Sequence, residues 1–265
     1  MAEKTKNAVA LDMMMSSFAM RSAGAESFVI VPDGYDLLDI ERFADTPRRI
    51  ATDHKFVSAK SFAQYLTRFS SPSMLLTASA DKAKMLAVID YHDQVDGFYR
   101  PSHGTHKATY SARLSDKIKA WLAICGRSLT QIEFGLFLEE HAVDVIQPEA
   151  AAIFEMVMQF EATKKVEFKS SQRLSDGSRQ FSYVEENQSR GGLTLPDRIV
   201  VRAHIFEGMD PQDVTFLLRF RINEGSLRFV VEMHNKEDVM REAFERCVDY
   251  VLHEVKPEQD VYWVE

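Results

Sequence analysis

The chain has 265 residues, 45% of them hydrophobic and 27% charged, which is typical of a soluble globular protein. Its formal net charge of −8 disfavours indiscriminate binding to nucleic acid, because the phosphate backbone would repel an acidic molecule. No stretch approaches the roughly 18 apolar residues that a membrane-spanning helix needs, so we expect no membrane association.

Residues 1–24 are predicted to form an N-terminal arm. Acidic residues interrupt its apolar run and no small-residue cleavage site follows, which argues against a signal peptide. Methionine side chains adapt easily to a docking surface, and a terminal segment frays unless it packs in a groove. We expect that groove on a second copy of the chain, so a homo-oligomer is predicted; packing on its own domain is the alternative. The candidate oligomer contacts are Met13, Met14, Met15, Phe18 and Met20.

Residues 25–114 predict short strands and one helix. Ser58 can cap a helix over residues 58–69, whose large apolar side chains recur on one stripe, and Pro72 follows its end. Apolar side chains alternate with polar ones in several short runs, as they do in strands. The predicted strands cover residues 27–31, 74–77, 85–91 and 106–110.

The middle of the chain, about 115–163, is predicted to be rich in helices. Ser115 and Thr130 are placed to cap helices over 115–124 and 130–143, and Pro148 suits the first turn of a third helix that ends near Thr163.

Residues 164–234 predict mainly strands. Asp176-Gly177 lies between two strand-like runs, 166–175 and 178–185, and this dipeptide favours a hairpin turn. Further strands are predicted over 198–206, 214–222 and 227–233, and an amphipathic helix over 235–254. The fold class is therefore expected to be α+β, an antiparallel sheet with helices packed on one face. Residues 25–265 are expected to form one domain with two lobes.

One polar constellation suggests metal or acid–base chemistry. Asp90 and His92 are two residues apart, so on a strand they would share a face. His103 and His106 follow closely, and carboxylate with imidazole ligands would suit a transition metal that activates water. The spacing matches no established metal signature, and the alternative has Asp90 stabilising a turn and the histidines in solvent. No bound cofactor is predicted.

A second constellation is a run of basic residues on the predicted sheet. A two-residue turn at Glu224-Gly225 would pair Ile222 with Leu227 and would place Arg221 directly opposite Arg228. Like charges facing each other destabilise a strand pair unless an anion or an acidic group relieves them. The relief would come from an external anionic partner or from Glu232 or the Glu139-Glu140 region of the same chain. The candidate partner-binding residues are Arg198, Arg202, His204, Arg219, Arg221 and Arg228.

Other sites receive less support. Cys125 and Cys247 have neither metal-ligand spacing nor a neighbouring base, as expected of free thiols in a reducing compartment. No GxSxG or HExxH motif occurs, and Gly191-Gly192 is not set in a phosphate-binding turn. Along the sequence, aromatic residues do not interleave with basic ones as they do in a surface that stacks single-stranded bases.

Several segments resemble a known family. Residues 87–92 (AVIDYH), 106–110 (HKATY), Trp121, 206–209 (FEGM) and 214–220 (VTFLLRF) are similar to the YfdQ-like family of phage and prophage proteins. The similarity spans roughly residues 25 to 255 and implies a bacterial host cytoplasm and a phage accessory role near DNA metabolism. The family has no assigned function, so the resemblance implies no reaction and no catalytic residue.

The favoured hypothesis is a non-enzymatic phage or prophage accessory protein. It would act through protein surfaces, as a homo-oligomer with a possible phage or host protein partner, in modulation of host defence or in phage DNA processing. One alternative is a metal-assisted hydrolase or nuclease built on Asp90, His92, His103 and His106. The other is a nucleic-acid-binding module that uses the arginine-rich sheet face.

Overall fold

The computed structural model describes residues 45–46, 49–95, 98–159, 162–163, 172–173, 179–180, 188–189, 195–223, 226–256 and 261–265. Residues 1–49 form one compact unit and residues 50–265 another, so nearly all of the described chain belongs to the larger unit. That unit contains two five-stranded sheets. The strand predicted over 27–31 lies outside the described residues.

The first sheet is built from segments at both ends of the larger unit. Its central strands are antiparallel, whereas the two edge strands, β1 and β16, join their neighbours in parallel. In spatial order its strands are β1 (Thr52–Phe56), β6 (His106–Ser111), β3 (Lys84–Val88), β2 (Leu75–Ser79) and β16 (Tyr262–Trp263).

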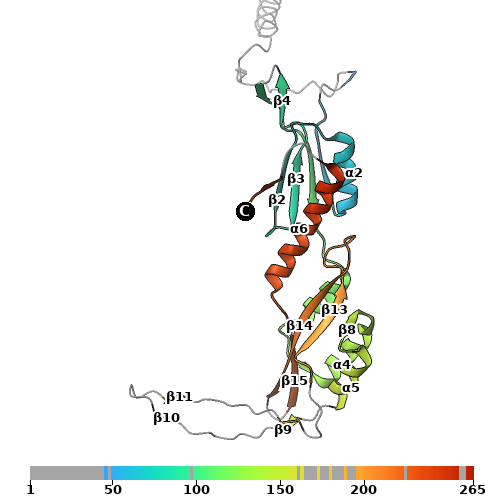
Figure 1. The fold of residues 1–265 in the computed structure, drawn as a ribbon, viewed down its shortest axis with the longest axis vertical. Coiled ribbons are helices and arrows are strands. Elements are labelled where there is room, and N and C mark those ends of the chain that lie inside the picture. The colour runs from blue at the N-terminus through green and yellow to red at the C-terminus, as the bar shows by residue number, and fades with distance from the viewer. Residues whose placement is uncertain are drawn as a thin grey trace, which may run out of the picture. The chain divides into compact units, whose positions relative to one another are not determined.

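Helices α2 (Ala59–Phe69) and α6 (Lys236–Val255) pack together on one face of this sheet (Figure 1). The side chain of Ser58 accepts a hydrogen bond from the Ser61 N–H, so α2 begins where the sequence predicts. Phe62 is fully buried and its ring stacks on Tyr110 of β6 at 5.8 Å. No described helix covers the opposite face, where the Leu86 side chain of β3 is 37% exposed.

The second sheet is antiparallel throughout. Its β14–β15 hairpin joins the strands predicted over 214–222 and 227–233. In spatial order its strands are β7 (Leu129–Thr130), β15 (Ser226–Met233), β14 (Gln212–Asn223), β13 (Arg198–Ala203) and β8 (Val145–Gln147). One face packs against α3 (Asp116–Ile124), α4 (Gln131–Glu140) and α5 (Ala150–Gln159), and Figure 1 shows α4 and α5 beside the strands.

Aromatic side chains fill the space between the second sheet and its helices. Trp121 of α3 is fully buried, and its ring lies 5.0 Å from Phe216 of β14 and 5.0 Å from Phe137 of α4. Phe134 of α4 stacks on Phe229 of β15 at 5.4 Å. The predicted α+β class with helices on one face is therefore confirmed, and it occurs in both sheets.

Three short strand pairs complete the described structure. β4 (His92–Val95) pairs with β5 (Phe98–Pro101) next to the first sheet, and β9 (Ala162–Thr163) pairs with β12 (Gln188–Ser189). β10 (Gln172–Arg173) pairs with β11 (Arg179–Gln180), so the segments on either side of Asp176-Gly177 are antiparallel, as the turn signal predicts.

Some predicted boundaries are wrong. The strand predicted to run from Met85 to Tyr91 ends at Val88, and residues 89–90 form a turn. The helix predicted over 130–143 ends at Glu140, where the His141 N–H bonds back to Phe137 and a short 3-10 turn, η2 (Ala142–Asp144), follows.

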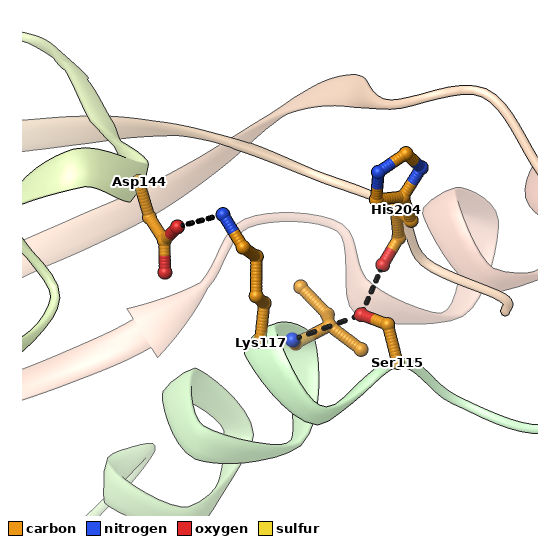
Figure 2. Close-up of polar contacts among 5 residues, drawn as sticks. Ser115, Lys117, Asp144 and His204 are labelled. Carbon is orange, nitrogen blue, oxygen red and sulfur yellow. Dashed lines mark hydrogen bonds and ion pairs between the residues drawn. The ribbon is translucent and has the colours of Figure 1, made fainter.

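Two polar contacts attach α3 to its surroundings (Figure 2). The Ser115 hydroxyl accepts from the Ile118 N–H and donates to the backbone carbonyl of His204, just beyond β13. Lys117 Nζ donates to Asp144 Oδ1 at 2.5 Å, and the Asp144 side chain is only 6% exposed whereas that of Lys117 is 49% exposed. The buried carboxylate of Asp144 therefore has a charged partner on the neighbouring helix.

We expect Lys117→Met to destabilise the protein by about 1.5–3 kcal/mol, because it leaves the buried Asp144 carboxylate without its charge-assisted hydrogen bond. Lys119→Met is the matched control on the same helix, since its partner Asp116 is 94% exposed and the loss should be much smaller. Urea denaturation of both variants measures the difference, and equal losses would contradict this role for Asp144.

Candidate functional site

The structure divides the proposed metal-site residues into two groups. Asp90 and His106 lie together at the start of β6, where the His106 N–H donates to the Asp90 carboxylate. His92 and His103 instead line a pocket on the uncovered side of the first sheet. Among the described residues, no three His, Cys, Asp or Glu side chains are placed so that they could hold a metal ion. The metal interpretation stays a prediction that this arrangement does not support.

Asp90 acts as a clamp on the loop that leads into β6. Its carboxylate accepts hydrogen bonds from the Thr105 N–H at 3.1 Å, the Thr105 hydroxyl at 3.2 Å and the His106 N–H at 2.8 Å. Burial alone would raise the pKa of Asp90, but the hydrogen bonds from His106, Thr105 and its own backbone outweigh it, and the pKa is lowered. Asp90 therefore has the turn-stabilising role of the alternative interpretation.

His106 belongs to the core of the first sheet and its covering helices. The side chain is 5% exposed, and Nε2 shares a hydrogen bond of 2.8 Å with the hydroxyl of Tyr65 on α2. The ring also contacts the edge of Phe69 at 5.5 Å. Burial lowers the pKa of His106, with a further lowering by His54, against the opposing charge of Asp90. A buried neutral imidazole between two aromatic rings connects α2 to the sheet.

The pocket beside this sheet has a volume of about 1160 Å³. Its floor is the uncovered sheet surface around Val88, which pairs directly with Leu75 and with Lys107. The β4–β5 hairpin and the following loop form a wall, with Arg100 and His103 in the lining. Tyr262 of the edge strand β16 completes it. Arg100, Lys107 and Tyr262 were not predicted from the sequence, because only the tertiary arrangement of the first sheet and the β4–β5 hairpin brings them together.

The second sheet shows the predicted register of β14 and β15. Ile222 pairs with Leu227, Phe220 with Phe229 and Leu218 with Val231. Arg221 consequently lies directly opposite Arg228, as predicted. Because side chains alternate along a strand, these arginines lie on the face opposite to the helix-covered Phe229. We call this surface, which faces away from α3, α4 and α5, the arginine face; it carries Arg198, Arg202, Arg219, Arg221 and Arg228.

Part of the arginine face is neutralised within the chain. Arg202 donates two hydrogen bonds to the Asp213 carboxylate, at 2.8 and 3.1 Å. Arg219 lies 3.3 Å from Glu232, the internal partner named in the sequence analysis, and Arg198 lies 3.7 Å from Asp197.

The central arginines of this face are less compensated. Among the described residues neither Arg221 nor Arg228 forms an ion pair, although the charge of Arg228 contributes to lowering the pKa of Glu133 after the hydrogen bonds from Thr130. His204, the remaining candidate, lies just beyond β13 and its Nδ1 bonds to the Met209 carbonyl at 2.5 Å. It is turned to a local loop contact.

The helical side of this sheet has the opposite charge. Residues 131–159, from the start of α4 to the end of α5, contain no lysine or arginine. Exposed carboxylates on this side are Glu133, Glu139, Glu140, Glu149 and Glu155. Glu133 lies near the edge of the sheet, where Arg228 pairs with Thr130 and its charge reaches Glu133. The sheet itself lies between the other four and the arginine face of the same chain. The same helical side exposes apolar groups, and Val143 is 90% exposed.

The two cysteines are ill suited to nucleophilic chemistry. Cys247 on α6 is fully buried, and burial raises the pKa of its thiol to about 11. Burial also raises the pKa of the half-buried Cys125. Both are free thiols, and a protonated thiol is a poor nucleophile.

Two further expectations concern the rest of the chain. The arm candidates Met13, Met14, Met15, Phe18 and Met20 lie outside the described residues. Among the helices that the structure describes, none combines the length and the apolar character that crossing a membrane requires.

We expect Asp90→Asn to make unfolding less dependent on acid. Because the pKa of Asp90 is lowered in the folded state, its ionised carboxylate stabilises the protein at pH values above the ordinary pKa of 3.8. This stabilisation is lost as the pH falls through the pKa of the folded state. The variant should be less stable than the wild type near neutral pH and should lose less on acidification, as denaturation midpoints between about pH 3 and 7 would report.

Asp53→Asn, an exposed carboxylate on β1, is the matched control. Parallel acid profiles for Asp90→Asn and the wild type would contradict the clamp. The lowered pKa of His106 causes a separate loss of folding stability, which begins as the pH falls below the ordinary histidine pKa of 6.5. This loss should also occur in the Asp90→Asn variant.

Comparison with known families gives one match. The family described as "Uncharacterized conserved protein (DUF2303)" matches residues 3–262, nearly the whole chain, and the chain therefore belongs to that family. Neither the curated proteins nor the solved structures gave a match.

Proposed function

We propose that this member of the DUF2303 family is a non-enzymatic protein that acts through its surfaces as a homo-oligomer. Its resemblance to the YfdQ-like family supports a phage or prophage accessory role in a bacterial cytoplasm, in host-defence modulation or phage DNA processing. The observation that carries the proposal is the charge asymmetry of the second sheet. One side of this sheet is the arginine face, and its other side is covered by acidic helices.

The arginine face needs a partner because of its own register. Arg221 and Arg228 face each other across β14 and β15, where like charges cost stability. The core fixes this register, since a shift by one residue would turn Phe229 and Val231 away from the helices. A carboxylate from outside the chain would relieve the repulsion by charge-assisted hydrogen bonds.

A second copy of the chain supplies such carboxylates. The helical side of the sheet has five exposed glutamates and no lysine or arginine from residue 131 to residue 159. It also exposes Ile132 (66%), Leu136 (60%) and Val143 (90%), which is typical of a surface that another protein covers. The arginine face offers apolar area in turn, because Val200 and Leu217 are only partly buried there.

The two complementary surfaces lie on opposite sides of one sheet, so they cannot meet within a chain. Their contact between copies would be head to tail, which produces a ring when the rotation closes and an open chain when it does not. A nucleic acid on the same face is less favoured. The net charge of −8 repels it, and the described outward positions of the strands carry no aromatic ring for base stacking.

We expect Arg221→Glu with Arg228→Glu to weaken self-association by roughly tenfold or more, because carboxylates would then face carboxylates. Glu139→Lys with Glu155→Lys should weaken self-association similarly. The chain with all four changes should assemble again, because the charges on both surfaces are then reversed. Sedimentation velocity over a series of concentrations measures these differences, and high salt should weaken the wild-type assembly.

Lys55→Glu with Lys60→Glu makes the same change of charge on β1 and α2 and is the matched control. A wild-type monomer at micromolar concentration, or equal loss in the control, would overturn the head-to-tail contact. Loss of oligonucleotide binding in the arginine variant, with assembly unchanged, would instead identify the face as a nucleic-acid surface.

The arm contributes a separable prediction. Deleting residues 1–22 should reduce the size of the assembly while the far-ultraviolet dichroism of the remaining chain stays near that of the wild type, because the methionine-rich segment is proposed to pack on a neighbour. An unchanged assembly size would show that the arm does not contribute to the interface. The role of the arginine face would then depend only on the results for the arginine and glutamate variants.

A further inference from the structure

The pocket on the first sheet has a lining unlike the rest of this acidic chain. Eleven described residues line it, and none of them is aspartate or glutamate. Arg100 and Lys107 carry permanent positive charge, and His92 and His103 add imidazoles. In a chain with 40 acidic and 32 basic residues, such a lining selects an anion.

Asp90 does not cancel this charge. It follows the pocket strand β3 closely in sequence, but it is not part of the lining, and its carboxylate already accepts hydrogen bonds from Thr105 and His106. The clamp also shapes the pocket, since the Gly104 N–H bonds to the Asp90 carbonyl and holds the loop over the floor. Gly104 has a φ of +60°, and a Cβ there would come 3.6 Å from Val88.

Aromatic rings are the second component of the lining. Tyr91 is 48% exposed and Tyr262 is 55% exposed, so both present ring surface to a ligand. Tyr262 arrives from the far end of the sequence, where β16 pairs with β2 and places Tyr262 beside Thr77. The Val264 N–H bonds to the Ala78 carbonyl at 2.8 Å and fixes this edge strand. Leu75, Val88 and Pro101 add apolar surface between the rings and the charges.

We propose that this pocket binds a nucleoside phosphate, with Arg100 and Lys107 on the phosphate and Tyr262 stacked on the base. Cationic groups beside exposed aromatic rings are the combination by which proteins hold nucleotides and single strands. A volume of about 1160 Å³ exceeds the roughly 300–1,000 Å³ of most small-molecule sites, so it accommodates one nucleotide or a short segment of a strand. The inference concerns a different sheet from the arginine face and is independent of self-association.

Calorimetric titration with three probes tests the site. The probes are inorganic phosphate, adenosine monophosphate and an oligothymidylate of about 12 nucleotides. Lys107→Ala and Arg100→Ala should each weaken binding of both nucleotide probes by about tenfold. Tyr262→Ala should weaken the nucleotide probes by at least roughly fivefold and leave phosphate binding unchanged, because only the base stacks on the ring.

Lys84→Ala is the matched control. Lys84 and Lys107 lie on the same uncovered face but at opposite ends of the strand pair, since Lys84 pairs with Ser111 and Val88 with Lys107. The control and the Arg221→Glu with Arg228→Glu variant should both bind like the wild type. Tighter binding of the oligonucleotide than of the monophosphate identifies a single strand as the ligand, and the reverse identifies a free nucleotide.

Three results would overturn the proposal. The first is no binding of either nucleotide probe by the wild type. The second is an equal loss in Lys84→Ala and Lys107→Ala, which would indicate diffuse attraction without a pocket. The third is an unchanged affinity for both nucleotide probes in Tyr262→Ala, which would indicate that the pocket binds the phosphate alone and does not contact the base.

Discussion

The pairing of β14 with β15 is the constraint on which the second sheet depends. Phe229 and Val231 must face α3 and α4, because their burial fills the space around Trp121 and Phe134. A sheet has only two faces, so the alternate residues Arg221 and Arg228 are forced together on the other one. The apolar core thus imposes a like-charge contact, and among the described residues neither arginine forms an ion pair within the chain. The proposed contact with a second copy follows from this arrangement.

One-sided coverage has a different consequence in the first sheet. Helices α2 and α6 bury Phe62, Tyr110 and Phe244, and the opposite face keeps Leu86 and Lys107 exposed. The β4–β5 hairpin and the edge strand β16 then build walls on that exposed face. A sheet covered by helices on one side can expose polar residues on its other side without loss of core packing. In the first sheet that side carries the pocket with Lys107 and Tyr262, and in the second sheet it carries the arginine face.

Asp90 shows how a local pattern can suggest chemistry that tertiary structure redirects. An aspartate two residues from a histidine resembles the start of a metal site when both lie on a strand. The strand ends at Val88, however, and the carboxylate is used by the backbone N–H groups of Thr105 and His106. The Asp90 carboxylate accepts hydrogen bonds from the loop that leads into β6, because these backbone N–H groups need acceptors. The same carboxylate oxygens are therefore already engaged and are poorly placed to bind a metal ion. His106 is likewise placed in the core by its bond to Tyr65.

The starts of three helices and the pairing of β14 with β15 follow from the sequence alone. Caps at Ser58, Ser115 and Thr130, and the alternation around Phe220 and Phe229, depend on residues close in the chain, so their physics is local. Which distant residues share a surface depends instead on the tertiary structure. Tyr262 joins Lys107 through the order of strands in the first sheet, and Arg100 reaches the same pocket from the β4–β5 hairpin. Glu139 is separated from Arg221 by the second sheet. Sheet order is set by the burial of many side chains at once, and no local spacing encodes it.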